Sequence, residues 1–250
     1  MPSLYALIKS FLNYIGNPQA NFQVNIQSTI PEASGLGSSA AVAWSLSNAL
    51  NLFFQTNLSK SELLKFANIS EKLIHVNPSG LDLATSSSNN PIIFQKNHKT
   101  INLSIASQIK GYLIIATTPK EGITKNAVQK VGQNAQMHPL LYHQYFDQIE
   151  SITYQAIESL QTGDLINFGT CLNENQKVLS KMNLSTNEIE NLIKIANQNG
   201  SLGTKITGSG LGGSIFALSS NLKGALNLEK IFRQSQAEFT HIISLSEYGN

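Results

Sequence analysis

Cysteine and arginine, on which disulfide-bonded and phosphate-binding proteins depend, are rare in this sequence. Among its 250 residues there is one cysteine, Cys171, and one arginine, Arg233. A lone cysteine cannot staple a fold by a disulfide, which indicates a cytoplasmic protein with Cys171 packed in its core. One arginine and a formal charge of +2 supply little attraction for phosphate backbones. No apolar run reaches the length of a membrane span, so we expect neither nucleic acid nor membrane as a partner.

Aspartate is also scarce, whereas apolar residues are not. Asp82, Asp147 and Asp164 are the only three aspartates, so any mechanism that needs an aspartate has three candidates. The hydrophobic fraction of 41% is sufficient for one large domain or two modest ones.

The spacing of apolar residues predicts an α+β fold in two halves that meet near residues 105–125. A capping box, Ser59 with Glu62, opens one of the expected helices. We expect helices over residues 4–15, 39–54, 59–74, 125–135, 139–161, 165–180, 186–199 and 226–236. We expect strands over residues 22–29, 91–94, 100–103, 112–118, 202–207, 214–218 and 240–246.

Residues 31–41, here called the first glycine loop, read Pro-Glu-Ala-Ser-Gly-Leu-Gly-Ser-Ser-Ala-Ala and lie between an expected strand and an expected helix. Glycines let a backbone approach an anion closely, and serines add hydroxyl donors. The free N–H groups and positive dipole end of the following helix would face the same ligand. The loop is therefore either a phosphate cradle or a plain serine-capped turn. It is not a Walker loop, because no Lys-Ser or Lys-Thr ends it.

Two acids, Glu71 and Asp82, flank a predicted turn at Asn77-Pro78-Ser79-Gly80. This turn can fold Asp82 back toward the helix that carries Glu71. Phosphoryl transfer from ATP needs Mg²⁺, which prefers one or two carboxylates, and a group that orients the acceptor hydroxyl and takes its proton. The competing interpretations are a solvated helix face for Glu71 and a helix cap for Asp82. We expect His75 to be structural.

Residues 205–214, here called the second glycine loop, read Lys-Ile-Thr-Gly-Ser-Gly-Leu-Gly-Gly-Ser between two apolar runs. Four glycines in six positions indicate close backbone approach or unusual φ angles, and the alternative is a flexible hairpin.

These strings together resemble the GHMP kinases, and within that family they look most like mevalonate kinases. The resemblance implies a two-domain fold. Residues 1–108 would form a βα N-terminal domain that is incomplete, and residues 109–250 a sandwich-like α/β C-terminal domain. It also implies ATP and Mg²⁺ as cofactors and mevalonate as the alcohol, phosphorylated on its primary hydroxyl for isoprenoid synthesis. Related kinases are often dimers, so the resemblance allows a homodimer.

The resemblance assigns roles to individual residues. Asp82 would act on the substrate hydroxyl, and Glu71 with Ser38 or Ser39 would hold Mg²⁺. The segment Gly122–Val128 resembles one that opens a helix beside the substrate, where Lys125 would either neutralise a carboxylate or be solvated. The expected phosphate-binding residues are Ser34, Gly35, Leu36, Gly37, Ser38, Ser39 and Ala40, and the expected substrate contacts are Thr124, Thr207 and Gly208.

The sequence departs from the family in several places. Leu211 stands where mevalonate kinases carry glycine, Ser214 where cysteine is frequent, and Gln176 at a common histidine position. The family's early Pro-Gly-Lys and Gly-Glu-His stretches have no match. A truncated reading frame, a second polypeptide and an inactive remnant would each explain this. The functions left open are mevalonate kinase, another GHMP kinase acting on phosphomevalonate or homoserine, and a truncated non-catalytic remnant.

Overall fold

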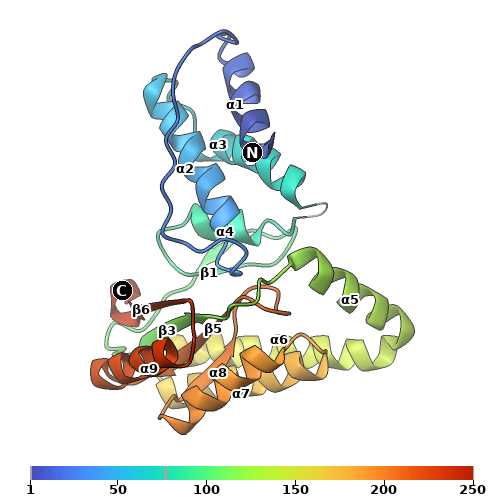
Figure 1. Cartoon of the computed structure of the whole chain (residues 1–250), viewed down its shortest axis with the longest axis vertical. Coiled ribbons are helices and arrows are strands. Elements are labelled where there is room, and N and C mark those ends of the chain that lie inside the picture. The colour runs from blue at the N-terminus through green and yellow to red at the C-terminus, as the bar shows by residue number, and fades with distance from the viewer. Residues whose placement is uncertain (1, 76–77, 250) are drawn as a thin grey trace. The chain divides into compact units, whose positions relative to one another are not determined.

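The computed structural model describes residues 2–75 and 78–249 (Figure 1). The chain divides into two compact units. Unit 1 consists of Met1–Glu32 and Gly37–Asn102, and unit 2 consists of Ala33–Leu36 and Leu103–Asn250. The boundary between functional domains at residue 108 stays a prediction.

Unit 1 is built mainly from helices that pack by their apolar faces. Its elements are α1 (Pro2–Tyr14), α2 (Ser38–Phe53), α3 (Lys60–Ile74), α4 (Leu81–Ser86), β1 (Ile92–Ile93) and β2 (Ile101–Asn102), the last two paired antiparallel. Leu7 and Phe11 on α1 belong to the same buried cluster as Phe66 on α3, and the ring centroids of Phe11 and Phe66 are 5.2 Å apart. The predicted capping box is confirmed: the Ser59 hydroxyl accepts from the Glu62 N–H, and the Glu62 carboxylate accepts from the Ser59 N–H.

The strand expected over residues 22–29 is wrong. This segment has no regular secondary structure, and none of its backbone groups bonds to another backbone group in the described part of the chain. Alternating apolar and polar residues define two faces, but a strand also needs a neighbour that shares its hydrogen bonds. Residues 22–29 have no such neighbour among the described residues, and Val24 and Ile26 remain 38% and 44% exposed.

Unit 2 combines an antiparallel sheet with five α-helices and one 3₁₀ helix among its described residues (Figure 1). The sheet has four strands in the order β4-β5-β3-β6. Its central strand β3 places Ile114 between Ala217 of β5 and Ile242 of β6. The elements are β3 (Tyr112–Thr117), α5 (Thr124–Met137), α6 (Pro139–Thr162), α7 (Leu165–Lys181), α8 (Asn187–Gln198), β4 (Gly203–Ile206), β5 (Ser214–Ser219), α9 (Leu222–Gln234), β6 (Phe239–Ser244) and the 3₁₀ helix η1 (Leu245–Tyr248).

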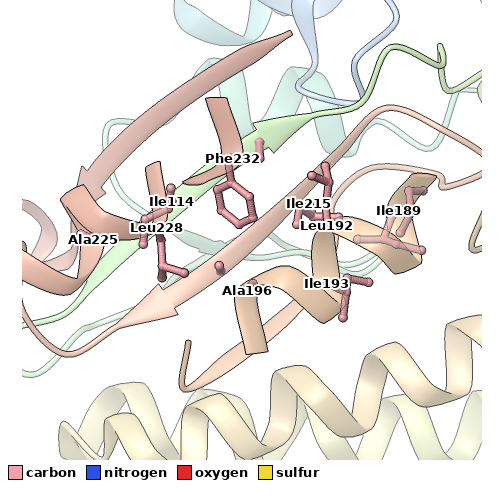
Figure 2. Close-up of a cluster of buried hydrophobic side chains, with 12 residues drawn as sticks. Ile114, Ile189, Leu192, Ile193, Ala196, Ile215, Ala225, Leu228 and Phe232 are labelled. Carbon is pink, nitrogen blue, oxygen red and sulfur yellow. The ribbon is translucent and has the colours of Figure 1, made fainter. Parts of the chain in front are cut away.

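The main core of unit 2 lies where α8 and α9 pack on the sheet (Figure 2). Residues of α8 at helical spacing, from Ile189 to Ala196, meet Ile114 and Ile215 from the strands, and Phe232 of α9 is fully buried among them. Cys171 on α7 is buried as expected. No helix in the described ranges combines the length and the apolar character needed to cross a membrane.

Helix α7 approaches the edge strand β4 so closely that only glycine fits at the contact. A Cβ on Gly203 would collide with the carbonyl oxygen of Gly169, and a Cβ on Gly169 would lie 2.5 Å from the Leu202 oxygen. Because backbone atoms on both sides cannot move independently of their elements, neither position tolerates a side chain.

We therefore expect Gly203→Ala to lower the free energy of unfolding by about 1–3 kcal/mol, the usual cost of overpacking. The matched control is Gly132→Ala on α5, where an added Cβ meets nothing within 4 Å. Because alanine is the better helix former, this control should gain about 0.5–1 kcal/mol. Urea unfolding followed by circular dichroism measures both, and equal effects of the two substitutions would contradict the close packing.

Candidate functional site

Glu71 is a buried acid in the last turn of α3, within unit 1. Its side chain is 3% exposed, and its Oε1 atom has no hydrogen-bond partner among the described residues. Burial raises the pKa of Glu71, the Ser39 hydroxyl and His75 act in the opposite direction, and the charge of Asp82 raises it further. The alternative of a solvated helix face is therefore wrong for Glu71.

A buried carboxylate oxygen without a partner is costly unless a cation or a proton compensates it. This gives a test of whether the residues fit Mg²⁺. The ion takes oxygen ligands and is commonly held by one or two carboxylates together with phosphate oxygens and water. Glu71 offers a free carboxylate oxygen, and Ser39 offers a hydroxyl close to it. The described residues contain no cluster of three or more acids, histidines or cysteines. The donor set fits an ion shared with phosphates.

Asp82 lies in the first turn of the short helix α4, which follows Gly80 at φ 90°. It is exposed and makes no capping bond, so the helix-cap interpretation is wrong. A Cβ built on Gly37 would lie 3.8 Å from the Asp82 carboxyl group, which places Asp82 against the residue that precedes α2. Unit 1 thus brings Ser39, Glu71 and Asp82 together at the N-terminal end of α2.

Helix α4 and the position of His75 were not foreseen from the sequence. A six-residue helix is too short to show a periodic pattern, and the only local signals are Gly80 and Ser79, whose hydroxyl accepts from the Leu81 N–H at 3.2 Å. His75 Nε2 lies 3.9 Å from Glu71 Oε2. The predicted turn includes Asn77, which with Val76 lies outside the described residues.

The N-terminal end of α2 has the properties of an anion site. Gly37 precedes it in the left-handed region, at φ 69°. Ser38, Ser39 and Ala40 are its first residues, and the first intrahelical bond runs from the Ala41 N–H to the Gly37 carbonyl at 3.0 Å. The N–H groups that open a helix have no intrahelical partner, and the helix dipole favours negative charge there.

Residues Ala33–Leu36 of the first glycine loop belong to unit 2 and are fixed by it. The Gly122 N–H donates to the Ala33 carbonyl at 2.9 Å, and the Ser214 hydroxyl donates to the buried Ser34 carbonyl at 2.8 Å. A Cβ on Gly208 would lie 2.7 Å from the Cα of Gly35. The two glycine loops therefore meet backbone to backbone, and the flexible-hairpin interpretation of the second loop is wrong.

The departures at Leu211 and Ser214 have structural explanations. Leu211 has φ 62°, a conformation that glycine adopts more easily. Its N–H donates to the Leu184 carbonyl at 2.7 Å, and its side chain packs against the cluster around Val178 and Met182. Ser214 is buried, where its hydroxyl also bonds to Thr117 at 2.8 Å. Both side chains are thus used to hold the second glycine loop.

The expected substrate residues all lie in unit 2. Thr124 begins α5, and its hydroxyl accepts from the Ser209 hydroxyl at 3.3 Å. Thr207 is half-buried and Gly208 is exposed, both at the start of the second glycine loop. Lys125 is exposed.

Lys205 and Gln176 hold the backbone just before the second glycine loop turns. The Lys205 ammonium donates to the Ile206 carbonyl at 2.6 Å, and the Ile206 N–H donates to the Gln176 side chain at 3.0 Å. The ammonium also lies 5.2 Å from the centre of the Phe216 ring. Burial lowers the pKa of Lys205 to about 8. The sequence identified Gln176 only as a departure and did not single out Lys205.

The lowered pKa of Lys205 predicts a specific dependence of stability on pH. Burial disfavours the charged form, so its cost is fully present below pH 8 and is relieved as pH rises from about 8 to 10.5. Relative to Lys205→Met, the wild-type free energy of unfolding should rise over this window, by up to about 3 kcal/mol.

Chemical unfolding at several pH values measures this difference. Lys177→Met, which removes an exposed lysine of α7, controls for the loss of one positive charge. A difference between wild type and Lys205→Met that stays constant from pH 7 to 10.5 would contradict the desolvation of Lys205.

Comparison with known proteins gives two family matches. Residues 3–90 match the model of the GHMP kinases N terminal domain, and residues 156–237 match that of the GHMP kinases C terminal region. Among curated proteins, the mevalonate kinase of Aeropyrum pernix is 30% identical over 90% of this chain and 68% of its own length. The mevalonate kinase of Thermococcus sibiricus is 30% identical over 80% of this chain and 60% of its own length.

Solved structures agree with these matches. The L. major mevalonate kinase, solved in complex with R-mevalonate, has a TM-score of 0.81 at 25% identity, with 96% of this chain and 76% of that chain covered. The Methanococcus jannaschii mevalonate kinase has a TM-score of 0.79 at 27% identity, with 97% and 74% covered. A galactokinase from Lactococcus lactis, at 17% identity and a TM-score of 0.71, shares the fold.

Proposed function

We propose that this chain, which belongs to the GHMP kinase family, transfers the γ-phosphate of ATP to the primary hydroxyl of mevalonate and forms 5-phosphomevalonate for isoprenoid synthesis. The observation that carries the proposal is the meeting of Ser39, Glu71 and Asp82 at the N-terminal end of α2. Phosphoryl transfer to an alcohol uses donors that bind the phosphates, a carboxylate that holds a metal ion and a group that accepts the hydroxyl proton. The anion site at α2, the buried acid with an unpaired oxygen and the exposed acid supply one of each.

The first glycine loop would bind the phosphates of ATP. Its serine hydroxyls and the N–H groups of Ser38 to Ala40 donate hydrogen bonds, and the dipole of α2 adds to the attraction. Ser34 to Leu36 form the part of this loop that unit 2 fixes. Glu71 with Ser38 or Ser39 would hold Mg²⁺, which when bound offsets the negative charge of the phosphates.

Asp82 would orient the mevalonate hydroxyl and accept its proton. The hydroxyl oxygen forms a bond to the γ-phosphorus, the bond from this phosphorus to the bridging oxygen breaks, and ADP leaves with the electron pair. Asp82 suits this role because its carboxyl group is exposed and lies beside Gly37, where no side chain intervenes. Thr124, Thr207 and Gly208 would position the remainder of the substrate from the second glycine loop and the start of α5.

We place the protein in the cytoplasm, where ATP is available and a lone buried cysteine stays reduced. We also assign residues 1–108 to the N-terminal and 109–250 to the C-terminal functional domain.

Asp82→Asn should lower kcat by about 10²–10⁴-fold, because the amide cannot accept the proton. The KM for ATP and the free energy of unfolding should stay near wild type, since Asp82 is exposed and makes no capping bond. Asp147→Asn is the control, because Asp147 is an exposed aspartate on α6 that pairs with His143. Mevalonate-dependent ADP release measures all three proteins, and wild-type turnover by Asp82→Asn would refute the role.

The second candidate is a GHMP kinase that acts on another small molecule. The observation that supports it is that Leu211 and Ser214 differ from the residues usual in mevalonate kinases. Mevalonate, phosphomevalonate and homoserine should be supplied separately to the same preparation. We expect ADP release with mevalonate alone. Release that depends on phosphomevalonate or homoserine would support the second candidate, and ATP binding without release for any of the three would indicate a non-catalytic protein.

Glu71→Gln should raise the Mg²⁺ concentration needed for half-maximal ADP release by about tenfold or more, because the neutral amide is a poor ligand for this ion. The fold should be retained, since the substitution is isosteric and removes a charge whose burial is unfavourable. Glu150→Gln, at an exposed position of α6, is the control. An unchanged Mg²⁺ requirement in Glu71→Gln would contradict the assignment.

A further inference from the structure

Gln176 is a buried residue of α7 whose side-chain amide bonds to two other elements of unit 2. Its side-chain oxygen accepts from the Ile206 N–H at 3.0 Å, where β4 ends. Its amide nitrogen donates to the Glu190 carboxylate of α8 at 3.3 Å. The hydroxyl oxygens of Ser180 and Ser185 lie 3.2 and 3.3 Å from the same nitrogen. Gln176 thus links α8 to the last residue of β4.

The partners of Gln176 fix which end of its amide is the acceptor. A backbone N–H can only donate, and an ionised carboxylate can only accept. A half-turn of the amide would place its NH₂ group against the Ile206 N–H and its oxygen against Glu190, so both bonds would be lost. The Ser180 hydroxyl donates to the same carboxylate at 2.6 Å and holds it beside the amide. Gln176 therefore presents its oxygen to β4 in one orientation.

Ile206 is held on both sides of its backbone. Besides the bond from its N–H to Gln176, its carbonyl accepts from the Lys205 ammonium at 2.6 Å, and its side chain is buried in the main core of unit 2. Thr207 follows, and its N–H donates to the Ser214 carbonyl at 3.0 Å. The peptide groups before and after Ile206 therefore have fixed directions where the second glycine loop begins.

Asn173, one turn before Gln176 on α7, bonds to the other end of the same strand. Because β4 lies at the edge of the sheet, its outward backbone groups need partners outside the sheet. The Thr204 N–H donates to the Asn173 side-chain oxygen at 3.0 Å, and the Asn173 amide donates to the Leu202 carbonyl at 3.2 Å. Asn173 thus holds the start of β4, whereas Gln176 holds the end that leads into the second glycine loop.

We propose that Gln176 is a positioning residue of the kinase reaction, which sets the direction in which Thr207 and Gly208 leave β4. This role rests on the proposed function, in which Thr207 and Gly208 contact the substrate. A displaced loop would collide with its neighbour, because a Cβ on Gly208 would already lie 2.7 Å from the Cα of Gly35. A neutral amide offers its oxygen at every pH, so this hold on Ile206 does not titrate.

Gln176→Met keeps the length of the side chain and removes both of its hydrogen-bonding ends. We expect kcat/KM for mevalonate to fall by about 10–100-fold, because small displacements of substrate-positioning groups have effects of this size. The matched control is Asn173→Leu, which removes bonds between the same helix and the same strand at the other end of β4. This control should unfold at a lower urea concentration and keep kcat/KM near the wild-type value.

Gln176→His gives a readout that a merely structural role would not change. Neutral histidine, which is common at this position in related kinases, has one acceptor and one donor, so it can bond to both Ile206 and Glu190. Protonation turns the acceptor into a donor that faces the Ile206 N–H. In the described chain, Glu190 on α8 and Lys205 on β4 are the ionisable side chains bonded to Gln176 or Ile206, and both remain in the variant.

The ratio of kcat/KM in Gln176→His to that in wild type therefore isolates the effect of the histidine. We expect a ratio near one at pH 8.5 that falls about tenfold as the pH drops below the ordinary histidine pKa of about 6.5. Hydrogen exchange of the Ile206 amide, followed by nuclear magnetic resonance without substrate, should show protection in wild type and its loss in Gln176→Met.

Four results would overturn the proposal. They are wild-type kcat/KM in a folded Gln176→Met, an equal loss of kcat/KM in Asn173→Leu, a ratio for Gln176→His that does not change with pH, and loss of folding in both variants of Gln176. Where Gln176→Met alone fails to fold, the pH profile of Gln176→His decides. A wild type without mevalonate-dependent ADP release would instead refute the proposed function, and with it the part that Gln176 has in it.

Discussion

Four residues of the first glycine loop, Ala33–Leu36, are held by unit 2 although the chain on either side of them belongs to unit 1. They are held by backbone contacts that side chains would prevent. A Cβ on Gly208 would lie 2.7 Å from the Cα of Gly35, which is too close for a side chain. A Cβ on Gly213 would lie 2.7 Å from the Ser34 oxygen. The next residue, Gly37, opens α2. The conformation of these four residues therefore depends on backbone contacts that a side chain at Gly35, Gly208 or Gly213 would break.

Several side chains of unit 2 hold the two glycine loops in place. The Ser214 hydroxyl donates a hydrogen bond to the Ser34 carbonyl. Leu211 has a left-handed backbone conformation, in which its N–H donates to the Leu184 carbonyl. Lys205 and Gln176 fix the backbone of Ile206 from both sides. Lys205 is half-buried, and the desolvation that lowers its pKa costs stability at neutral pH. This cost accompanies the hydrogen bond by which Lys205 holds the backbone beside the second glycine loop.

The sequence predicted most elements and the residues of the acid pair, but not their environments. Periodic apolar residues located the helices and the sheet strands of unit 2, and the capping box located the start of α3. The strand over residues 22–29 failed because alternation carries no information about a partner. Helix α4 was missed because six residues are less than two turns. No local pattern could reveal that Glu71 is buried with a free oxygen or that desolvation lowers the pKa of Lys205, since both depend on residues distant in sequence.

Whether unit 1 and unit 2 together carry out phosphoryl transfer can be measured directly by identifying the product. The purified chain should be incubated with ATP, Mg²⁺ and mevalonate, and the products followed by ³¹P nuclear magnetic resonance and mass spectrometry. We expect a new phosphomonoester signal from 5-phosphomevalonate that grows in step with ADP. ADP that accumulates with inorganic phosphate alone, or ATP that is bound and left intact, would contradict the proposed transfer.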